Sequence, residues 1–257
     1  MTLKKVLLKA FILFFALPVL VVADGHGTQE NVLSVQLNLC NLKDGASMKD
    51  YDDLLDDYFK WAKDNDVEVD FVRQTPLFTH ATPNSPDQWQ FADFLISDHK
   101  RSGETWDKWL GTKTGQKLNA RWGEMASCNI KYMALYPMHL DQATIQSDDS
   151  RVVSWDWCTP LEGVTPDQVI KKHAELAKQF EGKFNQSAWL VGIPTIGMAQ
   201  ASGYAHINVY KDFAAYQADR YFMDAEEGWR VYMDYQATIA SCTGEAVYLE
   251  EVLNRAN

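Results

Sequence analysis

The sequence predicts an α+β fold in which one βαββαβ unit is used twice in tandem. Two repeated motifs support this prediction. Cys40-Asn-Leu-Lys-Asp-Gly45 and Cys158-Thr-Pro-Leu-Glu-Gly163 each close an alternating apolar run, and a helical pattern follows each of them. Ala126-Ser-Cys128 matches Ala240-Ser-Cys242, each between a long helical stretch and a β-like run. The spacing of the two cysteines is nearly the same in both copies, which indicates an internal duplication.

The beginning of the chain predicts export. Residues 1–23 combine three early lysines with an apolar run that is short for a membrane span, and they end on the small-residue site Val21-Val22-Ala23. An uncleaved N-terminal anchor is the alternative. Residues 24–30 are polar and glycine-rich and are expected to form a flexible leader. The predicted location is therefore periplasmic or extracellular, with no membrane contact after cleavage.

Charge and composition narrow the classes of partner. The 257-residue chain has a formal net charge of −11 and no basic cluster, which argues against nucleic acid and anionic membrane surfaces. Nine Trp, eleven Tyr and twelve Phe supply enough aromatic surface for packed interiors or an apolar pocket. A small-molecule ligand is the partner that this composition favours.

The first copy is expected to occupy residues 31–140. Leu33, Val35, Leu37 and Leu39 alternate with polar residues, which is typical of a half-buried strand. Ser47 is a suitable N-cap for the amphipathic helix that follows. Further strands are expected at 67–78, 88–97 and 128–137, with a long helical stretch at 103–125 that Gly111 and Gly115 bend or interrupt.

A linker at 141–150 leads to the second copy, residues 151–257. Thr165 and Pro166 predict the start of its first helix, since proline is favoured at the first helical position. The remaining elements are expected to be strands at 151–158, 187–198, 204–210 and 244–252 and a mostly helical stretch at 213–239.

This element order resembles the ferredoxin-like fold. The duplication across nearly all of the mature chain resembles, more specifically, the dimeric α/β-barrel superfamily, in which two such sheets pack face to face. Here one chain would supply both sheets as a pseudo-dimeric barrel. The resemblance implies either a monomer with pseudo-two-fold symmetry or a homodimer in which each sheet pairs with its counterpart in another chain.

The resemblance also implies a disulfide pairing. In the strand order 4-1-3-2, the end of the first strand lies beside the start of the fourth. This predicts the disulfides Cys40–Cys128 and Cys158–Cys242, one in each copy, which suits an oxidising compartment. Loop entropy gives about 4 to 5 kcal/mol per bridge as an upper estimate. A catalytic or metal-binding role for the cysteines is the alternative.

Candidate site residues lie on the polar faces of the predicted strands. Asp156 near the end of one strand and His206 near the start of its antiparallel neighbour predict a general base with its orienting carboxylate. A histidine satisfied within a polar cavity wall is the alternative. The candidate ligand-binding residues are Gln36, Asn38, Ser154, Tyr204, Asn208 and Tyr210.

Two other histidines lie in settings that suggest a role. His173 falls on the apolar stripe of its helix and is expected to be a core histidine, with a haem ligand as the alternative. His26 would be the third residue after cleavage behind Ala23, where an amino terminus and an imidazole can bind Cu(II) or Ni(II). An incidental histidine in a flexible leader is the alternative there.

Three functional hypotheses follow. The chain contains no P-loop, G-x-G-x-x-G, G-x-S-x-G or H-E-x-x-H motif, and no cofactor is predicted. The preferred hypothesis is an exported protein that binds a small, partly apolar ligand in a cavity between the two sheets. The second is a cofactor-independent oxygenase, isomerase or lyase that uses His206 and Asp156. The third is a structural protein without a ligand.

Overall fold

The computed structural model describes residues 32–80, 89–198 and 203–256. The predicted targeting segment, the leader and His26 lie outside the described residues. Within them the chain forms a mixed α+β fold of eight strands and seven helices. No described helix is long and apolar enough to cross a membrane.

The elements follow one another in the same pattern in the two halves of the chain. The strands are β1 (Leu33–Leu42), β2 (Asp70–Phe78), β3 (Phe91–Ser97), β4 (Ala126–Leu140), β5 (Ser150–Pro160), β6 (Ala188–Ile196), β7 (Tyr204–Tyr210) and β8 (Ala240–Asn254). The helices are α1 (Met48–Asp64), α2 (His99–Gly111), α3 (Lys113–Met125), α4 (Gln142–Ser147), α5 (Pro166–Gln179), α6 (Phe213–Ala225) and α7 (Gly228–Thr238).

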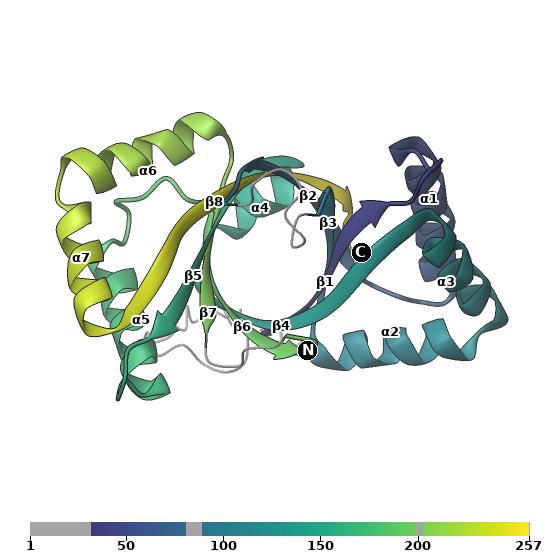
Figure 1. The fold of residues 1–257 in the computed structure, drawn as a ribbon, viewed down its shortest axis with the longest axis horizontal. Helices are drawn as coiled ribbons and strands as arrows, with labels where there is room; N and C mark the ends of the chain where they lie inside the picture. The colour runs from purple at the N-terminus through teal and green to yellow at the C-terminus, as the bar shows by residue number, and fades with distance from the viewer. Residues whose placement is uncertain (1–31, 81–88, 199–202, 257) are drawn as a thin grey trace, which may run out of the picture.

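The eight strands close into one antiparallel barrel, which is seen end-on in Figure 1. Their order is β1-β3-β2-β8-β5-β7-β6-β4. Each half of the chain contributes four neighbouring strands, and the two sets join at the β2–β8 and β4–β6 pairs. One chain therefore supplies both sheets. β4 and β8 extend beyond their predicted bounds, and each pairs with its own half on one side and with the other half on the other.

The first helix of each half starts from the same local chemistry. Ser47 accepts a hydrogen bond from the backbone N–H of Asp50, whose side chain bonds back to the Ser47 backbone. Thr165 and Gln168 form the same capping box at the start of α5, with Pro166 in the first turn. Both N-caps were predicted from the sequence, and both are confirmed.

Each long helical stretch is two helices rather than one. Thr112 ends α2 and begins α3, and its hydroxyl accepts a hydrogen bond from the Gly115 N–H at 3.1 Å. A Cβ on Gly115 would lie 2.3 Å from the Trp109 carbonyl oxygen, so only glycine fits this close turn. The predicted interruption is confirmed and falls at Thr112. In the second half, the corresponding break separates α6 from α7.

The inside of the barrel is a packed apolar cluster. The alternating residues Val35 and Leu37 of β1 point into it, as do Trp155 of β5 and Ile207 of β7. Ile145 of α4 packs against the same cluster from the segment that connects the halves. The space within the ring of Figure 1 is therefore occupied by side chains.

One polar network crosses this interior where the two halves meet. The Glu250 carboxylate accepts hydrogen bonds from Arg151 at 3.1 Å and from the Gln74 amide at 2.8 Å. The side-chain oxygen Oε1 of Gln74 accepts a hydrogen bond from the Trp155 indole at 2.9 Å. Arg151 also donates to the Ile145 carbonyl at 2.9 Å. The buried charges are thus paired and hydrogen-bonded, and the network joins β2 of the first half to β5 and β8 of the second.

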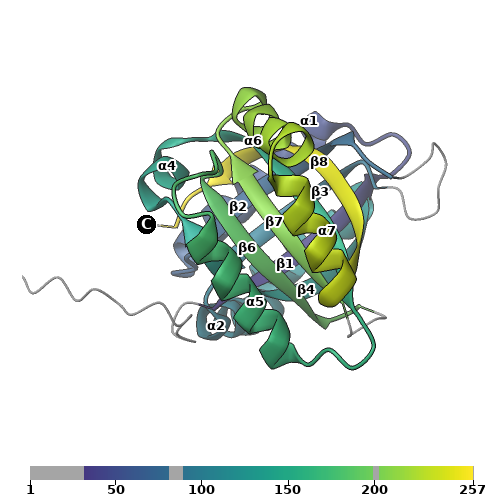
Figure 2. The ribbon, with the colours of Figure 1, turned by 90° about the vertical axis from the view of Figure 1, so that its left-hand side faces the viewer.

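Two layers of helices cover the outside of the barrel. α1, α2 and α3 flank the first half, and α5, α6 and α7 flank the second (Figure 1). The layers differ, because the backbones of α1 and α3 pack closely together, whereas α5 and α7 meet mainly through side chains, among them the His173–Tyr235 hydrogen bond and the Lys172–Asp234 ion pair. Figure 2 shows β6 and β7 running between α5 and α7.

The predicted disulfides are confirmed. Cys40 is bonded to Cys128 and Cys158 to Cys242, with Cα–Cα distances of 4.1 and 4.0 Å. In each half the two cysteines lie directly opposite each other on neighbouring strands. All four sulfur atoms are therefore engaged, which excludes the alternative of free catalytic or metal-binding thiols.

Candidate functional site

The polar face of the first strand in each half turns toward the helices and away from the opposing sheet. The side-chain oxygen Oε1 of Gln36 accepts hydrogen bonds from the Trp106 indole and the Tyr132 hydroxyl, both at 2.9 Å. The side-chain amide of Gln36 donates to Oδ1 of Asn38 at 2.9 Å. This corrects the predicted placement. The candidate ligand-binding residues of the first half lie beneath α2 and not between the sheets, because the alternating apolar residues fill the barrel.

In the second half, a similar polar row lies beneath α6. Ser154 faces the Asn208 amide at 3.5 Å and donates to the Glu245 carboxylate at 3.4 Å. Glu245 also accepts from the Tyr216 hydroxyl at 2.9 Å. Tyr210 packs edge-on against Tyr216, and burial raises the pKa of Tyr210 well above its usual value. Hydrogen bonds therefore link Asn208, Ser154, Glu245 and Tyr216 in a row, and the Tyr210 ring packs against its Tyr216 end.

His206 is the centre of a second polar cluster on the same face. Its Nδ1 atom accepts a hydrogen bond from the Trp189 indole at 3.0 Å, and its Nε2 atom lies 3.2 Å from the Tyr235 hydroxyl. The same hydroxyl lies 2.8 Å from Nε2 of His173 and is hydrogen-bonded to the Tyr204 hydroxyl. The Tyr235 oxygen of α7 is therefore contacted by His173 from α5 and by Tyr204 and His206 from β7. Trp189 of β6 completes the cluster through His206.

Asp156 takes different partners from those predicted. It lies opposite His206 in the β5–β7 register, but the two side chains form no hydrogen bond in the described part of the chain. The Asp156 carboxylate instead accepts from the Gly244 N–H at 2.9 Å and from the Tyr232 hydroxyl at 3.3 Å. Trp189 thus has the orienting position at His206 that was predicted for Asp156. Burial raises the pKa of the Asp156 carboxyl group.

Both histidines of the cluster are held in the neutral form. Burial lowers the pKa of His173 to about 4. Burial, followed by the proximity of His173, lowers the pKa of His206 to about 3, because both of its ring nitrogens are covered although the residue as a whole is only partly buried. No carboxylate among the described residues is hydrogen-bonded to either ring, so no such partner offsets the cost of a positive charge there. His173 is buried, as predicted.

The first half has a different set of side chains at the matching place. Asp93 lies opposite Asn38 as His206 lies opposite Asp156. The buried Asp93 carboxylate accepts from Arg73 at 2.8 Å and from the Tyr51 hydroxyl at 2.9 Å. The place of a neutral network in the second half is therefore occupied by an ion pair in the first.

Sequence reasoning missed Trp189 and Tyr235 as members of the site. Trp189 stands on the polar-facing side of β6 and is stacked beside the His206 ring with centroids 5.8 Å apart. The alternation of β6 could have placed it on that face. Tyr235 had no comparable signal, because its contacts depend on how α7 is rotated against the sheet.

No group of described residues offers a free set of metal ligands. The one cluster with suitable spacing combines Asp156 with Cys158 and Cys242, and the two sulfur atoms are already in a disulfide bond. Nε2 of His173 and Nε2 of His206 both face the Tyr235 hydroxyl. Within the described part of the chain, the arrangement is suited to hydrogen bonding and proton exchange.

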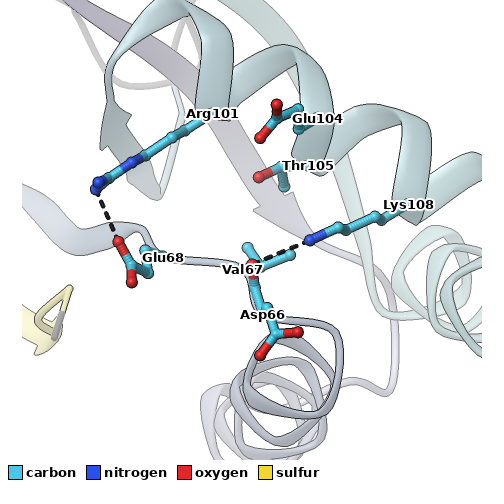
Figure 3. A pocket seen from close by; sticks show the side chains of 7 residues that line it. All are labelled: Asp66, Val67, Glu68, Arg101, Glu104, Thr105 and Lys108. Carbon is cyan, nitrogen blue, oxygen red and sulfur yellow. Dashed lines mark hydrogen bonds and ion pairs between the residues drawn. The ribbon is translucent and has the colours of Figure 1, made fainter.

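A separate surface cleft of about 250 Å³ lies between α2 and the turn that follows α1 (Figure 3). Its charged groups pair with their neighbours. Arg101 bonds to Glu68 at 2.8 Å, and Lys108 donates to the Asp66 carbonyl at 3.0 Å. None of the predicted site residues lines it.

Comparisons with known proteins define the fold. No protein-family profile and no curated protein sequence matches the chain. A candidate monooxygenase from Fusobacterium nucleatum aligns with a TM-score of 0.50 at 14% identity, covering 88% of this chain and 94% of that one. An anthrone oxidase-like protein aligns with a TM-score of 0.51 at 13% identity, covering 89% and 93%. Both are α/β-barrel proteins, and at this identity the likeness shows the shared fold alone.

Proposed function

We propose that the chain is an exported protein that binds a small, partly apolar molecule beneath α5 and α7, on the outer face of the second half. The observation that carries this proposal is the convergence of His173, Tyr204, His206 and Tyr235 without a charged partner. A few hydrogen-bonding groups within aromatic walls are typical of sites for small, largely uncharged ligands.

Packing favours this place over the space between the sheets. The barrel interior is filled by apolar side chains and crossed by the Arg151–Glu250 pair. The first half is closed by its own ion pair and by the contact of α1 with α3. α5 and α7 meet through side chains such as His173 and Tyr235, so the second half is the region where a ligand can enter by displacing a helix.

The predicted ligand-binding residues then divide into two groups. Tyr204 belongs to the cluster, and Ser154, Asn208 and Tyr210 extend its wall along β5 and β7, so we assign them to the site. Gln36 and Asn38 lie beneath α2 in the other half and hold that helix through Trp106. They have no part in this ligand site.

We further infer that the halves are two ferredoxin-like units, residues 31–140 and 151–257, joined by residues 141–150. Their matching caps, disulfides and strand registers support this division. Because one chain closes the barrel by itself, we propose a monomer with pseudo-two-fold symmetry.

An acid–base enzyme is the second candidate function. It is favoured by the fold neighbours named as a candidate monooxygenase and as anthrone oxidase-like, and by the chain of exchangeable protons at His206. Such an enzyme would be a cofactor-independent oxygenase, isomerase or lyase. Trp189 would orient His206, and Asp156 would supply a carboxylate on the neighbouring wall of the site.

Native mass spectrometry of the protein purified from its own host compartment tests the binding proposal. We expect wild type and the exposed-site control His139→Gln to carry a small molecule that His206→Gln loses. Identical ligand-free masses for all three would contradict the proposal. Metal analysis of the same samples would test the predicted copper or nickel site at His26 separately.

A further inference from the structure

Hydrogen-bond chemistry fixes the state of His206. The Trp189 indole can only donate, so Nδ1 of His206 must accept. The neutral ring then carries its proton on Nε2, which donates to the Tyr235 oxygen 3.2 Å away. Both ring nitrogens of His206 are therefore engaged in one tautomer.

The Tyr235 hydroxyl has two ways to complete its hydrogen bonds. It owns one proton and two lone pairs, and one lone pair is taken by His206. In the first arrangement, Tyr204 donates to Tyr235, and Tyr235 donates to Nε2 of His173. In the second, Nε2 of His173 donates to Tyr235, Tyr235 donates to Tyr204, and the Tyr204 proton points elsewhere. Both arrangements use every donor and acceptor at Tyr235.

Changing one arrangement into the other moves a proton between the ends of the chain. We propose that Tyr204, Tyr235 and His173 form a proton relay whose ligand-contacting end is Tyr204, and that His206 is a positioning residue that holds the Tyr235 oxygen in place. This rests on the proposed function, because it requires a ligand beneath α5 and α7. Tyr204 is the ligand end because its hydroxyl has Tyr235 as its one partner among the described side chains.

The proton transfer balances without an oxidant or reductant. A ligand with an acidic O–H or N–H gives its proton to the Tyr204 oxygen while Tyr204 gives its own to Tyr235. Tyr235 gives its proton to Nε2 of His173, and the ring releases its Nδ1 proton to a solvent base when α5 moves to admit the ligand. The ligand becomes its conjugate base, and the reverse sequence returns a proton to it.

Tautomer exchange suits this surrounding better than charging the ring. His173 is 2% exposed and has no hydrogen-bonded carboxylate, so an imidazolium there would be poorly stabilised. A ring that gains a proton on one nitrogen while losing one from the other remains neutral. The relay therefore works without a buried charge on His173.

Long-range ¹H–¹⁵N NMR of the histidine rings tests the relay in the ligand-free, full-length protein at pH 7. We expect His206 to show only the Nε2–H tautomer and His173 to show both tautomers. Tyr204→Phe cannot accept a hydrogen bond, so Tyr235 must then donate to His173, which should lose its Nε2–H tautomer. Tyr58→Phe, the same change at a buried tyrosine of the first half, should leave both rings unchanged.

Two results would overturn the relay. One is a single His173 tautomer in wild type that Tyr204→Phe does not alter, and the other is a proton on Nδ1 of His206. If Tyr204→Phe does not fold, Trp189→Phe replaces it, because freeing Nδ1 should give His206 a second tautomer, and an unchanged ring would count against the proposal. The spectra require no ligand, so a failure of ligand binding in native mass spectrometry remains a distinct outcome.

Discussion

The two halves of the barrel place opposite chemistry at one structural position. On the outer face of the first half, Asp93 and Arg73 form a buried ion pair that Tyr51 completes. On the outer face of the second half, His206 and Tyr235 lie in a neutral network. The skeleton around both is shared, including the cap of the first helix, the disulfide and the strand register. The comparison shows that the two halves share the features that build each of them and differ in the side chains beneath their helices.

The difference also separates stability from exchange. A paired carboxylate and guanidinium hold each other in place, and either one alone would be a buried charge. Neutral imidazole and phenol groups can exchange protons or partners at smaller cost. The first half therefore has a fixed charge pair at this position, while the second has neutral groups whose hydrogen bonds can rearrange.

The disulfide that the two halves share should stabilise each half to the same extent. Replacing Cys40 and Cys128 by serine should lower the free energy of unfolding by about 4 to 5 kcal/mol as an upper estimate, and the Cys158/Cys242 pair should do the same, because the closed loops span 88 and 84 residues. Urea denaturation at pH 7 measures both. A loss confined to one half would show that the bridges are not equivalent.

The ion pair of the first half should be the next largest contribution. Arg73→Leu leaves the fully buried Asp93 carboxylate without its cation and should cost about 3 to 5 kcal/mol. Arg121→Leu removes a more exposed partner of Asp57 and should cost less than about 1 kcal/mol. Urea denaturation compares the two. Equal losses would mean that burial does not decide the strength of the pair.

Acid should weaken the second half specifically. His173 has a folded pKa of about 4 and an unfolded pKa of about 6.5, so the unfolded state binds more protons between these values. The contribution of His173 to the free energy of unfolding is fully present above pH 6.5. Protonation of this residue should lower the free energy of unfolding by about 2 kcal/mol at pH 5. His206 acts in the same direction, whereas the raised carboxyl pKa values of Asp156 and Glu245 act in the opposite direction.

The contribution of His173 is isolated by comparing wild type with His173→Gln. Urea midpoints at pH 7 and pH 5 should differ less in the variant than in wild type. An unchanged pH dependence would show that His173 is not the residue whose protonation matters.

The smallest expected effect tests how loosely α5 and α7 are joined. The Lys172–Asp234 ion pair at 2.8 Å links the two helices at the surface. Lys172→Met should lower the free energy of unfolding by about 0.5 kcal/mol, because exposed pairs contribute little. A loss above about 2 kcal/mol in urea denaturation would mean that these helices are firmly coupled, which would weaken the contrast with α1 and α3.

The sequence was sufficient for features set by local periodicity. The alternation of Val35 and Leu37 predicts which strand face enters the core, and the cysteine motifs with the fold resemblance predict both disulfides. The alternation along β7 likewise places Tyr204 and His206 on one face, where the structure has them. These results depend on a two-residue period that any strand must obey.

The partners of His206 could not be predicted in the same way. Asp156 is its neighbour across the β5–β7 pair, but the Asp156 side chain points toward Gly244 and Tyr232 and accepts hydrogen bonds from them. Trp189 reaches His206 from the strand on the other side, and Tyr235 comes from a helix. Helix rotation against a sheet is fixed by tertiary packing, and one sequence carries no direct measure of it.

The seam at Gln74, Arg151 and Glu250 has a consequence for how the protein behaves at low concentration. A barrel assembled from two separate chains comes apart on dilution, because its equilibrium depends on protomer concentration. Here the two sheets are covalently tethered, so the barrel closes within one molecule and the buried charges are paired at any concentration. The closed barrel and the side chains that it positions therefore stay together however dilute the protein becomes.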